Sequence, residues 1–205
     1  MAKQLKYAFR MTHIDNIPHI IRYGLLRSAS PDCDRNFVSI GDRQIIGIRS
    51  VRPVCGVLMS ECVPFYLGPR TPMLYVIQHG YNGVTRREPW EIVYCVVRLS
   101  DILSADLDCV FSDGHALSAL TKFYSKDKLC DIDNIVSRDD VYSLNWNNDT
   151  DIDLKRRKEA ELLVIGDLPA EYICGYVVYD DYAKKRLTDS GISEALVIVA
   201  PHYYF

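Results

Sequence analysis

The sequence lacks the signals that mark several common classes of protein. Its longest apolar runs, residues 91–97 and 195–200, are strand-length and fall far short of the ~20 residues that a membrane-spanning helix needs. Its 11 glycines form neither a Gly-x-Gly-x-x-Gly nor a Gly-x-x-x-x-Gly-Lys-Ser/Thr motif, so no Rossmann or P-loop nucleotide site is indicated. It has no internal repeat and no low-complexity segment, which excludes solenoids and tails.

The cysteines do not indicate a disulfide framework. There are seven, an odd number, and none occurs in a Cys-x-x-Cys pair. Several interrupt apolar runs as small hydrophobic residues do, so we expect reduced, buried thiols and no zinc site. The first ten residues lack the apolar core and cleavage site of a secretory signal. Together with the missing membrane span, this predicts a cytoplasmic protein without a membrane contact.

The composition is that of a globular chain. With 205 residues, 48% of them hydrophobic and 25% charged, we expect a single domain over residues 1–205 with a proper core. The net charge is −3, but residues 1–100 carry 13 Lys and Arg against 7 Asp and Glu, whereas residues 101–205 carry 11 against 20. Faces of opposite sign follow from this distribution, either for an anionic ligand or as two merely solvated halves.

Hydrophobic patterning predicts strands and short helices without regular alternation. This favours a mixed α/β fold with largely antiparallel sheets. Asp15 or Asn16 can cap the first helix, and Gly24 can end it. We read residues 28–53 as a long functional loop with a helical turn near 42–48, and residues 63–75 as a rigid, bent strand or turn. The other expected elements are strands at 6–14, 91–98, 162–165, 172–179 and 195–200, and helices up to 23 and at 99–103, 115–123 and 182–189.

The densest run of charge, residues 155–161, leads directly into an apolar strand. A carboxylate at the mouth of a buried strand is held by rigid backbone, and the four cations before it can keep it ionised or steer an anion to it. Glu159 and Glu161 share a face if the strand already includes both. The alternative is a solvated charge run before a core strand.

Three further side chains suit a dinucleotide. His13, at the end of the first strand, can donate to a ribose or phosphate oxygen or satisfy a local carbonyl. Arg49 and Arg52 lie in the long polar loop, where a permanent guanidinium charge suits a pyrophosphate or a carboxylate, although loop arginines are often only solvated. His79 and His115 have no metal-ligand spacing to other residues, so we expect no metal.

Four blocks of the sequence, in order, resemble the DarT family. They are residues 7–26, which include Thr-His-Ile-Asp-Asn, residues 63–75, which include Pro-Phe-Tyr-Leu-Gly-Pro-Arg-Thr-Pro-Met-Leu, residues 111–116, and residues 156–164, which include Ala-Glu-Leu-Leu-Val. DarT enzymes are the toxins of DarT–DarG toxin–antitoxin systems and are similar in fold to ADP-ribosyltransferases. The resemblance implies transfer of ADP-ribose from NAD⁺ to a base in single-stranded DNA, with release of nicotinamide.

The resemblance also assigns roles to individual residues. Glu161 matches the catalytic glutamate, and Glu159 does not. The catalytic arginine aligns with Arg49, and Arg52 is the neighbouring candidate in the same loop. The NAD⁺-binding block and loop contribute Thr12, His13, Asn16 and Arg52. Departures from the family pattern are Leu67, Thr71 and His115, the last where Asn is more usual, and they bear on the choice of base.

These residues suit the implied chemistry. Breaking the nicotinamide–ribose bond builds oxocarbenium character, which an ionised Glu161 would stabilise. The acceptor base also loses a ring proton, and the same carboxylate, or one acting through Arg49, could serve as the base.

Single-stranded DNA exposes stacking faces and base edges, so aromatic and basic side chains are its expected contacts. Trp146, in a polar stretch before Glu161, is the aromatic we assign to DNA, and the cations are Lys155, Arg156 and Arg157. The resemblance further implies an antitoxin of the DarG type, whose macrodomain removes ADP-ribose from DNA, and we expect a monomer. Two alternatives remain: an enzyme of the same fold with an RNA or protein acceptor, or a catalytically silent nucleic-acid binding module.

Overall fold

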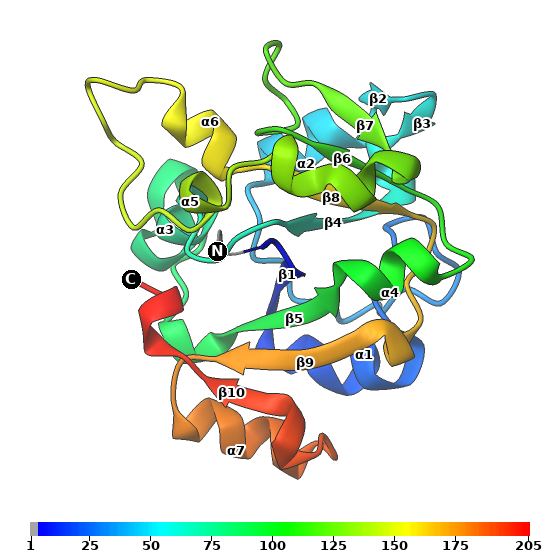
Figure 1. Ribbon diagram of the computed structural model, residues 1–205. Coiled ribbons are helices and arrows are strands. Elements are labelled where there is room, and N and C mark those ends of the chain that lie inside the picture. Colours follow the sequence, from blue (N-terminus) through cyan, green and yellow to red (C-terminus); the bar gives the residue numbers. More distant parts are fainter. Residues whose placement is uncertain (1–3) are drawn as a thin grey trace.

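The strands form one eight-stranded sheet and a separate two-stranded ribbon in the computed structural model, which describes residues 4–205 (Figure 1). The sheet order is β10-β9-β5-β1-β4-β8-β6-β7, and all neighbours are antiparallel except the parallel pair β9–β10. The prediction of a mixed α/β fold with largely antiparallel sheets is confirmed. The strands are β1 (Tyr7–His13), β4 (Cys62–Tyr66), β5 (Ile92–Arg98), β6 (Cys109–Ser112), β7 (Phe123–Ser125), β8 (Glu161–Ile165), β9 (Ile173–Val178) and β10 (Val197–Val199), with β2 (Pro53–Val54) and β3 (Val57–Leu58) in the ribbon.

The large sheet consists of two halves that are joined at one point. Strand β1 pairs with β5 along its whole length, from Tyr7 to His13, but its pairing with β4 is limited to Phe9 opposite Tyr66. The lower half in Figure 1 is β1, β5, β9 and β10, and the upper half is β4, β8, β6 and β7. Because β1 and β4 are otherwise unpaired with each other, the strands can diverge there and leave room for a ligand between the two halves.

Short helices and 3₁₀ turns connect the strands and cover the sheet. In Figure 1, α1 and α7 lie with the lower half, and α3, α5 and α6 lie together at the upper left. The helices are α1 (Ile17–Tyr23), α2 (Arg43–Ser50), α3 (Pro72–His79), α4 (Leu99–Ser104), α5 (Arg138–Val141), α6 (Leu154–Lys158) and α7 (Asp181–Asp189). The 3₁₀ segments are η1 (Ile14–Asn16), η2 (Met59–Glu61), η3 (Tyr81–Gly83), η4 (Pro89–Glu91), η5 (Lys126–Asn134), η6 (Ala170–Tyr172), η7 (Glu194–Leu196) and η8 (Pro201–Tyr203).

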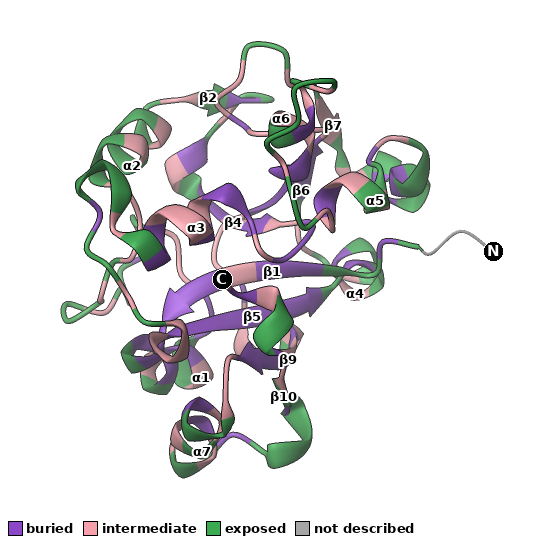
Figure 2. Ribbon diagram, turned by 90° about the vertical axis from the view of Figure 1, so that its left-hand side faces the viewer, coloured by how far each residue is buried: buried purple, intermediate pink, exposed green. Residues whose placement is uncertain are grey.

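Helix α2 is the helical turn expected inside the long polar loop. Asp42 caps it, and its Oδ1 accepts from the backbone N–H groups of Gln44 at 2.8 Å and Ile45 at 3.3 Å. No residue of α2 is buried, and Figure 2 shows the helix exposed at one side of the molecule. The position of α2 therefore depends on few contacts, one of which is made by the side chain of Arg49.

Helix α1 ends as expected but is not capped as expected. Gly24 adopts a φ of +83°, and its N–H donates to the Ile20 carbonyl, which closes the helix. Asn16 makes no side-chain cap to α1. Its amide oxygen accepts instead from the N–H of Val38 at 2.8 Å, and its amide nitrogen donates to the Thr12 hydroxyl and the Val38 carbonyl, both at 3.0 Å. Asn16 thus fastens the polar loop to β1.

Two expected elements are wrong. Residues 115–123 form turns that lead into β7, not a helix, because short-range bonds such as the Ser118 N–H to the His115 carbonyl organise them. The proline-rich segment 63–75 holds two regular elements, the end of β4 and the start of α3. Pro72 occupies the first turn of α3, where its missing N–H costs nothing, and Thr71 caps the helix. The prolines thus mark the boundary between two elements.

The cysteines pair with no partner in residues 4–205, as expected for reduced thiols, but they are not uniformly buried. Cys62, Cys95 and Cys109 are buried, whereas Cys33, Cys55 and Cys130 are exposed. Among the residues described, no helix is long and apolar enough to cross a membrane.

Candidate active site

A large cavity opens where β1 and β4 separate. Its volume is about 960 Å³, at the upper end of the roughly 300–1,000 Å³ found for ligand sites. Residues from β1, β4, α2, α3 and the segment before β8 line it, so elements that are far apart in the sequence meet there. The charged or polar side chains in its wall include Arg10, Arg49, Tyr66, Glu159 and Glu161.

Glu161 is the first residue of β8 and lies opposite Tyr66 of β4. Its neighbours Leu162 and Leu163 are fully buried on the two faces of the strand. The Glu161 N–H donates to the Ser112 hydroxyl at 3.0 Å, so β6 also fixes its backbone. The paired strands β4 and β6 on either side of β8 hold the backbone of Glu161 in a fixed position. Glu161 is only 2% exposed.

Arg49, near the end of α2, forms an ion pair with the Glu161 carboxylate from the opposite side of the cavity. Its Nη2 lies 2.6 Å from Oε2 of Glu161 and its Nη1 lies 3.0 Å from Oε1, a two-pronged ion pair. The backbone N–H of Ala116 adds a third bond to Oε1 at 3.2 Å. Burial alone would raise the pKa of Glu161, but the Arg49 charge and these bonds lower it, so the carboxylate is ionised.

The structure separates the two candidate arginines of the loop. Arg52 lies just beyond the end of α2, outside the cavity wall, and only its backbone bonds to Arg49 and Met59 are formed. Arg49 alone of the two reaches Glu161. This geometry favours Arg49 over Arg52 as the partner of Glu161.

Of the four residues predicted to bind NAD⁺, two line the cavity and two, His13 and Arg52, lie outside its lining. Thr12 and Asn16 are in the wall, and both are almost fully buried. His13 is 4% exposed and outside the cavity lining. Its ring bonds to the N–H of Asp15 at 3.2 Å and to the Glu91 carboxylate at 3.3 Å, so it caps η1 and ties β1 to η4.

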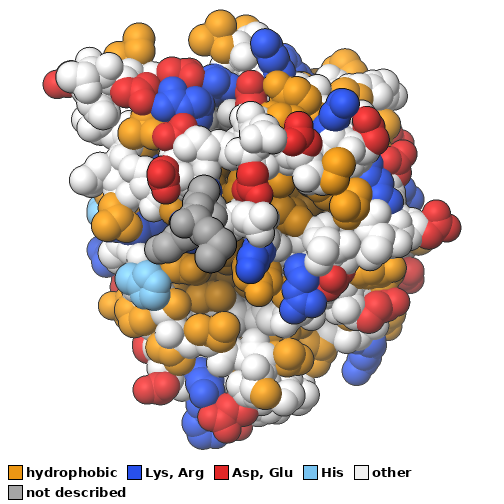
Figure 3. Space-filling model, viewed as in Figure 1, with side chains coloured by type: hydrophobic (Ala, Val, Ile, Leu, Met, Phe, Trp, Pro, Cys, Tyr) orange, Lys and Arg blue, Asp and Glu red, His pale blue; other side chains and the backbone are white. Residues whose placement is uncertain are grey.

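Of the basic residues before Glu161, some line the cavity and others do not. Lys155 and Arg156 line the cavity, but Arg157 does not. Arg157 is held by Asp140 at 2.7 Å and Asp151 at 2.6 Å, and these carboxylates leave it little charge for DNA. Figure 3 shows cations and acids interleaved at its upper left, where α5 and α6 lie, so this face is not uniformly basic.

Arg156 mainly fixes the turn that serves Glu161. It pairs with Asp153 at 2.7 Å and Asp113 at 2.9 Å, and its carbonyl accepts from the N–H of His115 at 2.8 Å. A Cβ on Gly114 would lie 2.4 Å from its guanidinium, so only glycine allows this approach. The turn so held presents the N–H of Ala116 to the carboxylate of Glu161.

Trp146 lies outside the cavity wall. Its ring packs edge-on against Tyr75, with centroids 5.7 Å apart, and against Phe205 at 5.4 Å. The structure therefore gives Trp146 a packing partner on the outer side of α3, and does not place it beside Glu161.

Sequence reasoning missed Arg10 and Tyr66. Arg10 projects from β1 into the cavity and donates to the Pro64 carbonyl at 3.3 Å; burial and then the Arg49 charge lower its pKa. Burial, followed by the charges of Glu161 and Glu159, raises the pKa of Tyr66 far above its usual value. The available signal for Arg10 was a lone cation inside an otherwise apolar strand.

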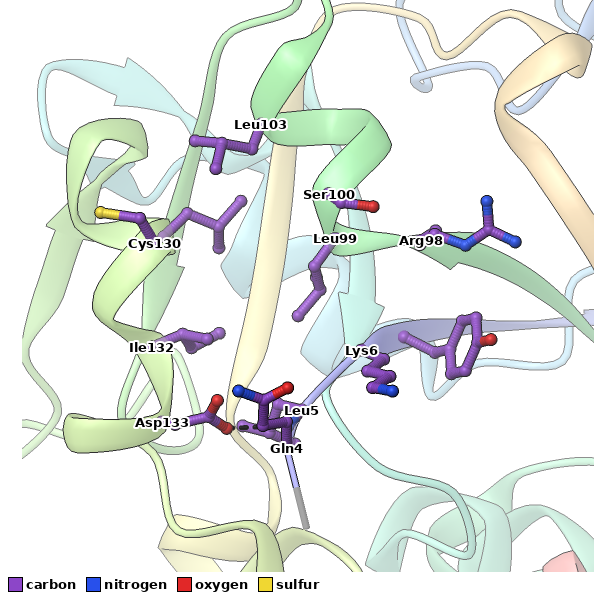
Figure 4. A pocket seen from close by; sticks show the side chains of 12 residues that line it. Gln4, Leu5, Lys6, Arg98, Leu99, Ser100, Leu103, Cys130, Ile132 and Asp133 are labelled. Atoms are coloured by element: carbon purple, nitrogen blue, oxygen red, sulfur yellow. Dashed lines mark hydrogen bonds between the residues drawn. The ribbon is translucent and has the colours of Figure 1, made fainter. Parts of the chain in front are cut away.

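A second cavity, of about 350 Å³, lies between the start of β1, α4 and η5 (Figure 4). Its charged side chains include Lys6, Arg98 and Asp133, and Asp133 accepts from the N–H of Leu5 at 2.8 Å. None of the predicted site residues lines it. No group of three His, Cys, Asp or Glu within residues 4–205 is arranged to hold a metal ion.

The fold matches that of a class of enzyme, the ADP-ribosyltransferases. Among solved structures, the chain is similar to the Thermus sp. 2.9 DarT in complex with ADP-ribosylated ssDNA, with a TM-score of 0.84, 24% identity, and coverage of 100% of this chain and 99% of that one. The same enzyme in complex with NAD⁺ gives a TM-score of 0.79 at 23% identity, with both chains fully covered. At these identities the likeness establishes the fold.

Sequence comparisons define the family more narrowly. A family model described as "ssDNA thymidine ADP-ribosyltransferase, DarT" matches residues 9–205. A DNA ADP-ribosyl transferase of Escherichia coli O127:H6 is 33% identical over 184 residues, which cover 87% of this chain and 83% of the relative. The Thermosipho africanus DarTG in complex with ADP-ribose is 27% identical with a TM-score of 0.82, covering 98% of this chain and 51% of that one.

The chain belongs to the DarT family. This confirms the family predicted from the four sequence blocks, and with it the predicted class of NAD⁺-dependent DNA ADP-ribosyltransferase.

Proposed function

We propose that this protein transfers ADP-ribose from NAD⁺ to a thymidine base in single-stranded DNA and releases nicotinamide. The observation that carries the proposal is the ionised Glu161 clamped by Arg49 in the wall of a dinucleotide-sized cavity. The family model, which names ssDNA thymidine as the acceptor, supports the choice of base.

The cavity suits NAD⁺ in both size and charge. The pyrophosphate of NAD⁺ is anionic, and Arg10 and Arg49 bring two guanidinium groups into the wall. Thr12 and Asn16 add polar groups on the β1 side, and Asn16 also holds the loop through Val38. We assign NAD⁺ binding to Arg10, Thr12 and Asn16. His13 lies outside the cavity lining and holds β1 in place through its bond to Glu91.

Glu161 stabilises the positive charge that develops on the ribose. As the bond between the ribose C1 and the nicotinamide nitrogen breaks, its electron pair neutralises the pyridinium and the sugar gains oxocarbenium character. A carboxylate held ionised in a largely water-excluded wall favours that state over the ground state. Arg49 keeps Glu161 ionised and in place.

The acceptor strand enters over α6. Lys155 is exposed at the cavity rim and forms no ion pair among residues 4–205, so its charge is available for a DNA phosphate. Arg156 lies beside it with its charge shared between two aspartates. We assign the DNA contact to Lys155 first and to Arg156 second, and we retain Trp146 as a contact only for nucleotides outside the cavity.

We propose that the protein acts in the cytoplasm as a monomeric toxin and that a DarG-type antitoxin restrains it. The support comes from the Thermosipho africanus relative, a fusion of a DNA ADP-ribosyl transferase with a DNA ADP-ribosyl glycohydrolase. Such a fusion joins an activity that adds ADP-ribose to DNA with one that removes it. Residues 1–205 then form the single catalytic domain.

Mass analysis of acceptors tests the proposal. The protein is incubated with NAD⁺ and, separately, a thymidine-containing single-stranded oligonucleotide, its duplex, the RNA equivalent, or cell protein. We expect the mass of one ADP-ribose on the single strand and none on an oligonucleotide without thymidine. Labelling of RNA or protein alone would overturn the DNA assignment, and binding without any nicotinamide release would identify a silent binding module.

A further inference from the structure

Glu159 lines the cavity wall, and its carboxyl group has no partner within residues 4–205. It is the residue after α6, two positions before Glu161, and it is only 9% exposed. Its backbone N–H donates to the Arg156 carbonyl, but no hydrogen bond or ion pair within residues 4–205 reaches its carboxyl oxygens. The strand β8 begins only at Glu161, so the condition under which Glu159 would share a strand face with Glu161 is not met.

Among residues 4–205, the carboxyl oxygens of Glu159 are neither bonded nor among the fully buried side-chain atoms that lack a partner, so they remain accessible from the cavity that Glu159 lines. Other acids of this chain are engaged, since Glu91 is bonded to His13 and Glu161 to Arg49. The oxygens of Glu159 are therefore open to a ligand in the cavity. The partner of Glu159 is therefore to be sought in a substrate.

The reaction needs a proton acceptor that Glu161 is poorly suited to be. Thymidine has one ring N–H, at N3, and this nitrogen must lose its proton to form a neutral N-glycosidic bond. The carboxylate of Glu161 already accepts three hydrogen bonds, and its pKa is lowered, so it is a weak base. Arg49 is a cation and has no lone pair to receive a proton.

The surroundings of Glu159 make it a stronger base. Burial raises its pKa to about 7, Lys155 acts against this and the charge of Glu161 adds to it. A base whose pKa lies near the working pH combines a large ionised fraction with a strong pull on the proton. The charged and titratable groups that act on it from α6, α2, β4 and β8 are Lys155, Lys158, Arg49, Tyr66 and Glu161.

We propose that Glu159 is the general base that removes the N3 proton of the acceptor thymidine, while Glu161 stabilises the ribose cation. This inference rests on the proposed function. In the step, an Oε of Glu159 takes the N3 proton and the N3 electron pair forms the bond to the ribose C1. The bond from C1 to nicotinamide breaks and its electron pair stays on nicotinamide. Glu159 afterwards releases its proton to water.

The two glutamates are separated by measuring two reactions of each variant. Nicotinamide release without DNA needs cleavage of NAD⁺ but no thymidine base, whereas transfer to an oligonucleotide needs both. We expect Glu159→Gln to retain nicotinamide release within about threefold and to lose 10²-fold or more in transfer, the range of general-base catalysis. Glu161→Gln should lose both. Glu171→Gln, the same change at an exposed position outside the cavity, should lose neither.

A substrate with a more acidic N3–H distinguishes a base from a group that merely positions DNA. The oligonucleotide carries 5-fluoro-2′-deoxyuridine in place of thymidine, because fluorine makes N3–H easier to remove. We expect this base to restore at least tenfold of the transfer by Glu159→Gln and to change the wild-type rate far less. The wild-type transfer rate should also rise through pH 7 with a slope that the variant lacks.

Equal transfer by wild type and Glu159→Gln would overturn the inference, as would a deficit that the fluorinated base leaves unchanged. If the wild type itself modifies no single-stranded DNA, the proposed function fails instead. Retained nicotinamide release by Glu159→Gln shows that the variant is folded.

Discussion

The guanidinium of Arg49 and the carboxylate of Glu161 meet side by side, with two hydrogen bonds of 2.6 and 3.0 Å across the catalytic cavity. The pair joins α2, which buries no residue of its own, to the rigid start of β8. Arg49 therefore has two effects: it keeps Glu161 ionised, and it ties the exposed helix α2 to the start of β8. The predictions below separate these effects.

Replacing Glu161 with Gln should reduce kcat for nicotinamide release by about 10²–10³, because glutamine keeps the shape but cannot oppose the ribose cation. KM for NAD⁺ should change little, since the lost interaction forms mainly in the transition state. Steady-state release of nicotinamide from NAD⁺ measures both constants. A variant with normal kcat would remove Glu161 from the chemistry.

Replacing Arg49 alone should lower the free energy of unfolding. Replacing Glu161 as well should restore part of that loss. Arg49→Ala leaves a buried carboxylate unpaired, and breaking such a pair costs about 3–5 kcal/mol. The double variant Arg49→Ala with Glu161→Gln should be more stable than Arg49→Ala alone, although both are inactive. Urea unfolding of the four proteins gives the coupling energy. Additive losses would mean that the pair contributes no coupling energy to folding stability.

Substitutions of Lys155 and Arg157, which lie two residues apart, should affect different measurements. The first should weaken DNA binding, and the second should lower thermal stability. Lys155→Ala should weaken binding of single-stranded DNA and reduce the slope of log K against log salt by about 0.7, as expected for one lost contact to a single-strand phosphate. Arg157→Ala should leave that slope unchanged and lower the melting temperature, because its charge serves Asp140 and Asp151. Fluorescence anisotropy at several salt concentrations and thermal unfolding check the two. A changed salt slope for Arg157→Ala would contradict the assignment.

Local sequence predicted β1, β5, β8, β9 and β10 because their signals are local, and it missed the short strands β6 and β7. The apolar runs at β5 and β8 and the glycine that ends α1 need no tertiary context. The roles of the individual cations in the run 155–161 could not be predicted from local sequence. The i–3 and i–4 spacing of Asp153 to Arg156 and Arg157 indicates ion pairs on a helix, but Asp113 and Asp140 come from distant segments.

The site residues show the same division. Arg49 and Arg52 are equivalent as loop arginines, and the choice between them depends on where α2 ends, a boundary that sequence locates poorly. The relation of Glu159 to Glu161 stayed open in the sequence because it depends on the first residue of β8. Trp146 was assigned to DNA from its polar neighbours, yet its ring packs on Tyr75, more than 70 positions earlier in the chain.

The buried amine of Lys158 should make folding stability rise with pH between about 8 and 10.5. Lys158 is fully buried and donates to the Val141 carbonyl at 3.1 Å; burial lowers its pKa from 10.5 to about 8. In this window the unfolded chain binds the proton and the native chain does not, so raising the pH favours the native state.

Lys158→Met removes this group from the titration. Relative to the variant, the wild type should gain about 1.5 kcal/mol between pH 8 and 9.5, because one differential proton supplies 1.36 kcal/mol per pH unit and the native amine is still half protonated at pH 8. The comparison stops at pH 9.5 because burial raises the pKa of Tyr94, so ionisation of that phenol opposes folding at higher pH. Lys128→Met, at an exposed lysine, is the matched control and should follow the wild type at every pH. Urea unfolding at each pH makes the measurement, and parallel curves for wild type and Lys158→Met would show that the amine is charged in the native protein throughout, held so by carbonyls such as that of Val141.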